Sequence, residues 1–325
     1  MAEGLTKGAQ KNQPRLLQRF TRDAHLTPRA ARLHDQSLGE RMRIRTTVAA
    51  VSGGLVLAAL AVPVAQADGG GLHKPTAAER FGVSRAATST AAADEELPVV
   101  SKVTVNGGKN IVAGLTGVQT FDVSLTASHS AGIQDAYIDL WHGREHADYD
   151  GVFVPNEQNA TCTAVSATTS TCKLTITVDA GRYLYMNSLA GTWHVTAAAI
   201  AADETGSDYW NDFYGTHRIQ RASKLTANAA PEPVKKGKTI TVTGKLTRAN
   251  WETRKYAGYS TQPVKLQFRK KDSSTYTTVK TVKTNSKGDL KTTVKATVDG
   301  FYRWSFAGTS TTPAVNAAGD FIDVK

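Results

Sequence analysis

Acidic side chains around Gly151 have the types and the spacing that could bind a calcium ion. Asp148, Asp150 and Glu157 fall at positions 3, 5 and 12 of a possible twelve-residue calcium loop, and the glycine falls at its turn position. Carboxylate oxygens are ligands that Ca²⁺ prefers, and this spacing lets one loop surround the ion. The first position holds histidine instead of aspartate, however, and Pro155 interrupts the loop. Calcium binding is therefore an alternative function, beside the simpler interpretation in which these acids keep an exposed loop soluble. Calcium is the only cofactor that the sequence suggests.

A neighbouring pattern has the residue types of a zinc peptidase. His142, Glu145 and His146 match the H-x-x-E-H motif, which needs both histidines on one face of a helix and the glutamate as a base. Here the motif ends a strand-like run and contains Gly143, so no such helix is predicted. The chain also lacks the G-x-S-x-G elbow of serine hydrolases. We assign no catalytic residues and expect a protein that is not an enzyme.

Aromatic residues gather in a second acidic stretch. Residues 209–214 read Tyr-Trp-Asn-Asp-Phe-Tyr, and Asp203, Glu204 and Asp208 precede them. An exposed platform of this kind could stack on sugar rings while the carboxylates bind hydroxyl groups. The same run could instead cover the core of a β-sandwich with its polar tips in water. A carbohydrate-binding module is therefore a weaker alternative.

The net charge of +11 is distributed unevenly along the chain. Residues 99–222 contain 7 basic and 12 acidic residues, whereas residues 223–325 contain 19 basic and 7 acidic residues. Five basic side chains fall on the predicted outward faces of strands in the second range: Lys245, Lys265, Arg269, Lys291 and Lys295. A positively charged surface attracts polyanions, so anionic cell-wall polymers or extracellular glycans are the expected partners. The alternative is that the lysines only keep the sheets soluble. Nucleic acid is not expected, because no recognition helix accompanies the dispersed lysines.

The segment from Met42 to Ala67 has the three parts of a secretory signal peptide. A charged start is followed by an apolar block and by the small-x-small exit Ala65-Gln66-Ala67. We expect cleavage after Ala67 and a secreted protein without stable membrane insertion. Because the apolar block is near the lower length limit of a spanning helix, an uncleaved N-terminal membrane anchor is the alternative. Residues 1–41 are expected to be an upstream extension before the true start.

The only two cysteines are Cys162 and Cys172. In an oxidising compartment these residues should form a disulfide bond. Such a bond would close a short loop and contribute about 2–3 kcal/mol. Two free thiols are the alternative.

Two folded domains are predicted after a flexible spacer. Residues 68–98 are rich in small and polar residues, as spacers are, and a short helix near 77–83 would have nothing to pack against. Between 99 and 222, seven short runs alternate in type with period two, which predicts an acidic β-sandwich domain. Residues 143–159 and 201–215 are predicted as its long loops.

Residues 223–325 alternate more clearly. Ile240, Val242 and Leu246 are separated by threonine, glycine and lysine, as in antiparallel strands with one buried and one wet face. This pattern predicts a second, basic β-sandwich domain.

Three segments of the second domain resemble an Ig-like domain of secreted proteins from streptomycete-type actinobacteria. Residues 231–251 begin Pro-Glu-Pro-Val-Lys-Lys-Gly, residues 263–271 read Pro-Val-Lys-Leu-Gln-Phe-Arg-Lys-Lys, and residues 300–308 read Gly-Phe-Tyr-Arg-Trp-Ser-Phe-Ala-Gly. The resemblance covers residues 223–325 and, less specifically, the preceding domain. It implies an all-β chain with two tandem Ig-like β-sandwich domains, and export, but no reaction. The family is uncharacterised and is sometimes labelled calcium-binding.

The leading prediction is a secreted, non-enzymatic binding or structural protein. It would associate with the cell envelope or extracellular matrix through its basic C-terminal Ig-like domain.

Overall fold

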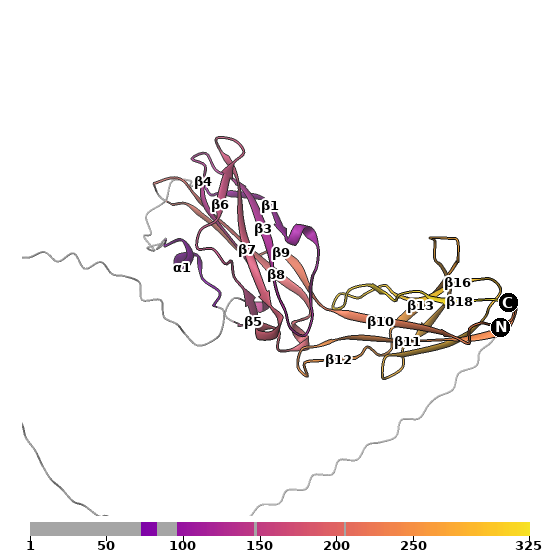
Figure 1. Ribbon diagram of the computed structural model, residues 1–325. Helices are drawn as coiled ribbons and strands as arrows, with labels where there is room; N and C mark the ends of the chain where they lie inside the picture. The colour runs from indigo at the N-terminus through magenta and orange to yellow at the C-terminus, as the bar shows by residue number, and fades with distance from the viewer. Residues whose placement is uncertain (1–72, 83–95, 146–147, 205) are drawn as a thin grey trace, which may run out of the picture. The chain divides into compact units, whose positions relative to one another are not determined.

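The computed structural model of the protein describes residues 73–82, 96–145, 148–204 and 206–325 (Figure 1). The predicted upstream extension and signal segment, residues 1–67, lie outside the described residues. Within the described part of the chain, no helix is long and apolar enough to cross a membrane.

The first domain consists of two facing β-sheets. One sheet has the strand order β1-β3-β7-β6, and the other has the order β2-β9-β8-β4-β5. Paired strands are antiparallel except β2 and β9, which run parallel. The strands are β1 (Val99–Val105), β2 (Ile111–Ala113), β3 (Val118–Ser128), β4 (Ile133–Glu145), β5 (Asp148–Phe153), β6 (Thr161–Ala164), β7 (Thr169–Asp179), β8 (Gly191–Ala201) and β9 (Asp208–Arg221). Short helical turns lie at η1 (Asn106–Gly108), α2 (Ala180–Tyr183) and η2 (Asn187–Leu189).

The core of this domain forms where alternate side chains of the two sheets meet. Val123 and Leu125 of β3 enter it from the first sheet, and Ile138 and Leu140 of β4 enter it from the second. All four side chains are fully buried. Burying one such side chain contributes about 1.5–3 kcal/mol, so the period-two pattern favours two facing sheets.

Both segments predicted as long loops contain strands. Strand β4 continues to Glu145 and pairs with β5, and β9 already begins at Asp208. In β9, Tyr209 lies opposite Ala199 of β8. The loop prediction was wrong because it rested on acidic and aromatic content, whereas the backbone follows the pairing partners that β4 and β8 offer.

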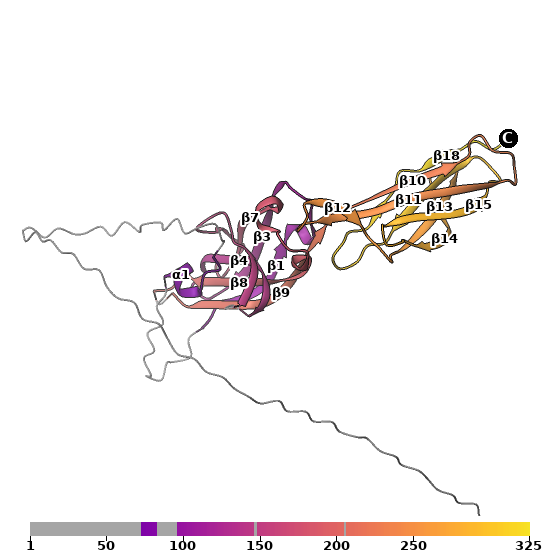
Figure 2. The same ribbon diagram turned by 90° about the horizontal axis from the view of Figure 1, so that it is seen from below.

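A short segment before the first domain covers the outer face of its second sheet. Helix α1 (Ala77–Phe81) begins with a capping box in which Thr76 and Glu79 each bind the other's backbone N–H. The Phe81 ring of the helix labelled α1 in Figure 2 meets Trp210 of β9 edge-on, with ring centroids 5.9 Å apart. The expectation that a helix here would have nothing to pack against was therefore wrong, because this sheet has aromatic side chains on its outer face as well.

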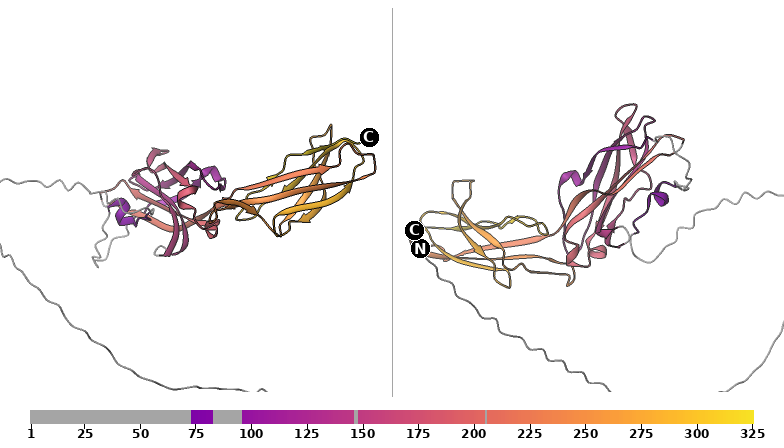
Figure 3. Two further views of the ribbon diagram at one scale, coloured as in Figure 1. Left: turned by 60° about the horizontal axis from the view of Figure 1, so that its bottom comes forward. Right: turned by 180° about the vertical axis from the view of Figure 1, so that it is seen from behind.

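The second domain is another pair of sheets. In one sheet, β11 lies between β10 and β15 and also pairs with β12. The other sheet has the strand order β14-β13-β16-β17, and β18 also pairs with β16. The long strands β10 and β11 are orange in Figure 3. The strands are β10 (Ser223–Ala230), β11 (Thr239–Asn250), β12 (Lys255–Gly258), β13 (Pro263–Lys270), β14 (Thr277–Lys283), β15 (Asp289–Lys295), β16 (Gly300–Phe306), β17 (Val315–Asn316) and β18 (Asp320–Ile322).

The core of the second domain follows the predicted alternation. Ile240, Val242 and Leu246 of β11 are fully buried and pack with Trp304 of β16. Gly244 lies in the same row because a Cβ atom there would collide with the Trp304 ring. Two pairs of facing sheets confirm the prediction of an all-β chain with two tandem Ig-like β-sandwich domains.

The end of β11 and the residue after it contribute to the first core. Ala249 and Trp251 are fully buried and belong to the hydrophobic cluster of the first domain. The Trp251 indole N–H donates a hydrogen bond to the carbonyl of Gly114 at 2.8 Å, and the Trp251 backbone N–H donates to the side chain of Asn187 at 3.0 Å. Trp251 therefore belongs to the first domain by packing, although it follows a strand of the second.

The predicted disulfide bond is present. Cys162 of β6 lies opposite Cys172 of β7, and their sulfur atoms are 2.00 Å apart. The alternative of two free thiols is excluded.

Candidate functional site

The second sheet of the first domain has two buried faces. Alternate residues of a strand point to opposite faces, so Ile138 and Leu140 enter the core while Tyr137, Asp139 and Trp141 point outward. The outward-pointing side chains are nonetheless 2%, 0% and 0% exposed. Something must therefore cover this face, and residues 73–82 supply the cover.

The centre of the covered face is a buried lysine. Lys74 is 0% exposed. Its Nζ atom lies 3.1 Å from Oδ2 of Asp139, 2.6 Å from Oδ1 of Asp212 and 2.9 Å from Oγ1 of Thr196. These three partners come from β4, β9 and β8, three neighbouring strands of one sheet. We call Lys74, Asp139 and Asp212 the buried triad.

Aromatic rings form the walls around the buried triad. The Lys74 Nζ atom lies 5.7 Å from the ring centroid of Trp141 and 5.6 Å from that of Trp210. Tyr137 stacks on Trp210 with ring centroids 5.2 Å apart. Ring faces attract a cation and exclude water, so they strengthen the electrostatic interactions inside the site.

Asp139 lies in the least polar part of the triad. Its Oδ2 atom accepts hydrogen bonds from Lys74 and from the Tyr137 hydroxyl at 2.9 Å, whereas its Oδ1 atom has no hydrogen-bond partner among the described residues. Burial raises the pKa of Asp139 above its usual value, and the nearby Lys74 only partly offsets this effect. Burial, with the Asp139 charge second, also raises the pKa of Tyr137, so its hydroxyl stays a hydrogen-bond donor.

Asp212 has a different environment from Asp139. Its side chain is 21% exposed. Besides Lys74, its Oδ1 atom accepts hydrogen bonds from the Trp210 indole at 3.0 Å and from the Thr196 hydroxyl at 3.3 Å. Hydrogen-bond donors stabilise the ionised form of a carboxyl group. The triad therefore combines one carboxyl group that favours the protonated form with one that is well placed to carry a charge.

Helix α1 is held beside the triad by a second ionic contact. Arg80 lies 2.9 Å from the Asp135 carboxylate, and these side chains are 11% and 12% exposed. The guanidinium group also donates to the carbonyl of Ala136 at 3.3 Å and lies 5.6 Å from the Tyr137 ring centroid.

The buried triad was not predicted from the sequence. Lys74 lies in the segment interpreted as a spacer, and Asp212 lies in the aromatic run considered for sugar binding. The available signal lay in one strand. Tyr137, Asp139 and Trp141 share one face of it, while the residues between them, on the other face, are apolar. A strand that is hydrophobic on both faces needs a cover on both faces.

The residues predicted to bind calcium do not point to one centre. Asp150 contacts Nδ1 of His142 at 2.5 Å, and Glu157 accepts hydrogen bonds from the backbone and the hydroxyl group of Thr175 on β7, at 2.8 and 2.6 Å. Asp148 begins β5. Among the described residues, no three His, Cys, Asp or Glu side chains are grouped to hold a metal ion. Calcium binding by this stretch stays a prediction. His146 of the H-x-x-E-H motif lies outside the described residues.

The five basic residues predicted to bind polyanions lie on two sheets. Lys245 of β11 and Lys291 and Lys295 of β15 belong to one sheet, and Lys265 and Arg269 of β13 belong to the other. The four lysines are exposed, and Arg269 is half-buried. Because the two sheets face each other across the core, their outer faces point in opposite directions. The five residues form two basic surfaces instead of one.

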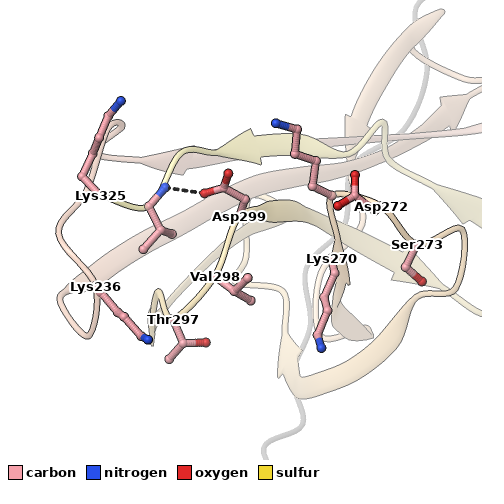
Figure 4. A pocket seen from close by; sticks show the side chains of 10 residues that line it. Lys236, Lys270, Asp272, Ser273, Thr297, Val298, Asp299 and Lys325 are labelled. Carbon is pink, nitrogen blue, oxygen red and sulfur yellow. Dashed lines mark hydrogen bonds between the residues drawn. The ribbon is translucent and has the colours of Figure 1, made fainter.

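A shallow pocket of about 610 Å³ lies at one end of the second domain. Four lysines and two aspartates are among the residues that line this end pocket: Lys236, Lys270, Lys271, Lys325, Asp272 and Asp299. Figure 4 shows Lys236 and Lys270 on either side of Thr297 and Val298. Asp299 accepts a hydrogen bond from the backbone N–H of Val324 at 2.8 Å.

One family model matches residues 111–199, and its description is a family of unknown function (DUF5707). The match includes Asp139 and Thr196 but neither Lys74 nor Asp212. Comparison with curated protein sequences finds no match.

Solved structures similar to this chain include two fragments of intimin. The D00-D0 domain is 17% identical with a TM-score of 0.23, over 68% of this chain and 99% of that chain. The D0-D1 domain is 18% identical with a TM-score of 0.23, over 70% of this chain and 99% of that chain. The full ectodomain (Ig1-Ig3) of mouse nectin-like molecule 4 is 14% identical with a TM-score of 0.22, over 70% of this chain and 65% of that chain.

Proposed function

We propose that this chain is a non-catalytic extracellular binding or structural protein whose basic second domain attaches it to anionic polymers of the cell envelope or extracellular matrix. The observation that carries the proposal is the excess of cations over ion-pair partners in residues 223–325, which contain 19 basic and 7 acidic residues. Within this fully described range, the salt bridges join Lys245 to Asp289 at 3.1 Å and Lys325 to Asp323 at 3.0 Å. Most of its positive charge is therefore available to an external ligand.

The distribution of the charge indicates the kind of ligand. Lysines lie on the outer faces of both sheets and also around the end pocket. A small anion would occupy one place only, whereas a long polyanion can follow the surface and contact several of these places. Each contact between exposed charges is weak, so the attachment depends on their number. The Cys162–Cys172 bond supports the extracellular location, because disulfides persist in oxidising compartments.

The test is co-sedimentation of the purified chain with isolated cell walls at two salt concentrations. Exposed charges interact over about 10 Å at 0.1 M salt, and this length shortens as salt is added. We expect the chain to sediment with the walls at low salt and to be released at roughly half-molar salt. Equal recovery of the chain in the supernatant at both salt concentrations would refute the proposal. The positive charge would then serve only to keep the domain soluble.

Two variants with the same loss of charge locate the contact. One replaces Lys236, Lys270 and Lys271 of the end pocket with glutamine. The other replaces Lys245, Lys291 and Lys295 on one sheet face with glutamine. A polymer bound along the whole surface should be weakened to a similar extent by both variants. A loss confined to the first variant would restrict the site to the end pocket.

A further inference from the structure

Lys74 and Asp139 are placed as the two reactants of an amide bond. The amine nitrogen is within 3.1 Å of a carboxyl oxygen, and both side chains are completely buried. In water, an ammonium ion and a carboxylate do not react, because the nitrogen has no free electron pair and the carboxylate is a poor electrophile. A buried pair can instead pass the proton along its hydrogen bond, which replaces two charges with an amine and a carboxylic acid. These uncharged forms are the ones that condense.

We propose that Lys74 and Asp139 are joined by an intramolecular isopeptide bond, which the folded protein forms by itself with Asp212 as the proton carrier. The modification is independent of polymer binding by the second domain. It would fix residues 73–82 covalently to β4.

The environments of the two carboxyl groups decide which one is attacked. Asp139 is fully buried, and the Tyr137 hydroxyl donates a hydrogen bond to its Oδ2 atom. Burial favours the neutral form of Asp139 and outweighs the opposing effect of the Tyr137 hydrogen bond, which draws electrons from the carbonyl carbon. Asp212 is partly exposed and accepts hydrogen bonds from Trp210 and Thr196, which suit an ionised carboxylate. Asp139 is therefore the electrophile, and Asp212 is the base.

The reaction balances without any further reactant. A proton moves from the Lys74 ammonium group to the Asp139 carboxylate along their hydrogen bond, which gives a neutral amine and a carboxylic acid. The amine nitrogen attacks Cγ of Asp139 and forms the new N–C bond. Asp212 takes one proton from this nitrogen and returns it to the departing hydroxyl group, which leaves as water when its C–O bond breaks. Asp212 ends as the carboxylate that it was at the start.

Bond formation also removes charge from the site. Before the reaction, the buried Asp139 carboxyl group is paired through Oδ2 only, and its Oδ1 atom has no hydrogen-bond partner among the described residues. A buried charge that is incompletely hydrogen-bonded is costly. Afterwards, the same position holds a neutral amide, and one ammonium–carboxylate pair has disappeared. The Asp212 carboxylate remains with its Trp210 and Thr196 donors.

The experiment is peptide mapping of the folded chain by mass spectrometry after reduction of the disulfide. Trypsin does not cut between Lys74 and Pro75, so the lysine remains in a peptide that ends at Arg80, and Asp139 lies in the peptide 110–144. We expect these two peptides as one branched species, lighter than their sum by one water molecule. Two separate peptides of unmodified mass would overturn the proposal. A link to the peptide 183–218, which contains Asp212, would overturn the assignment of Asp139 as electrophile.

Two variants and a matched control test the roles. Lys74→Arg keeps the positive charge but has no amine that can form the bond, so both peptides should appear separately. Lys102→Arg, at an exposed position of β1, is the control and should keep the branched species. Asp212→Asn keeps the shape of the side chain but cannot carry the proton, so the folded variant should form the bond at least tenfold more slowly. Folding of each variant is checked by circular dichroism. Unchanged formation in Asp212→Asn would refute the role of Asp212.

Discussion

Replacing Trp251 with alanine should destabilise the first domain, although this residue follows a strand of the second. The indole is fully buried in the first hydrophobic cluster and donates a hydrogen bond to the carbonyl of Gly114. Truncating a buried tryptophan costs about 3–5 kcal/mol. The carbonyl that loses its donor adds about 1 kcal/mol, which places the total near the upper end of that range. A loss of about 5 kcal/mol raises the unfolded population roughly several thousandfold.

Hydrogen exchange with mass spectrometry can locate this effect. In Trp251→Ala, exchange should accelerate in β2 and around Asn187, whereas β13 and β16 should keep their protection. Trp304→Ala is the matched control, because Trp304 is also fully buried and its indole also donates to a backbone carbonyl, that of Thr243 at 3.0 Å. This control should have the opposite pattern. If Trp251→Ala accelerated exchange in the second domain alone, the packing argument would be refuted.

Three further outcomes are expected. Replacing Cys162 and Cys172 with serine should lower the free energy of unfolding of the first domain by about 2–3 kcal/mol in a denaturant titration, since the bond closes a short loop; no change would mean that the bond does not constrain the unfolded chain. Lys74→Met removes the cation beside Asp139, so the pKa of this buried carboxyl group should rise further above its unfolded value. The resulting stability is present at low pH and is lost as pH rises through the folded pKa, so the melting temperature of this variant should be lower at about pH 8 than at about pH 5; equal values would contradict the burial of this charge. If the first domain binds calcium, a calorimetric titration with calcium should show a heat of binding, and Asp150→Ala should abolish it. The absence of any heat with the unaltered chain would refute the calcium prediction.

The sequence predicted those parts of the fold in which one face of a strand is buried and the other is exposed to solvent. In β11, the alternation of Ile240, Val242 and Leu246 with polar residues was enough to place the core face. The same kind of reasoning predicted the disulfide bond, because predicted export together with two cysteines leaves few alternatives. It gave no warning of Trp251, whose partner Gly114 lies 137 positions earlier in the chain.

The buried triad could not be predicted by reading local patterns. Lys74 lies between Gly69-Gly70-Gly71 and Thr76-Ala77-Ala78, and such small and polar runs indicate a spacer when taken alone. Its role depends on two carboxylates that only the pairing of β4 with β8 and of β8 with β9 brings together. What the sequence did contain was a strand with apolar and aromatic residues at every position from Ala136 to Trp141 except Asp139. Such a strand indicates a missing cover but does not identify the segment that provides it.

The position of Lys74 has a consequence for the order of folding. Its two carboxylate partners lie 65 and 138 positions later in the chain. Contacts across such separations form late, because the intervening chain must first be ordered. During synthesis from the N-terminus, the lysine must wait until β9, the last strand of the first domain, has joined its sheet. Until then the aromatic outer face of β4 is open to water and to other chains, and this interval is when the protein is most exposed to aggregation.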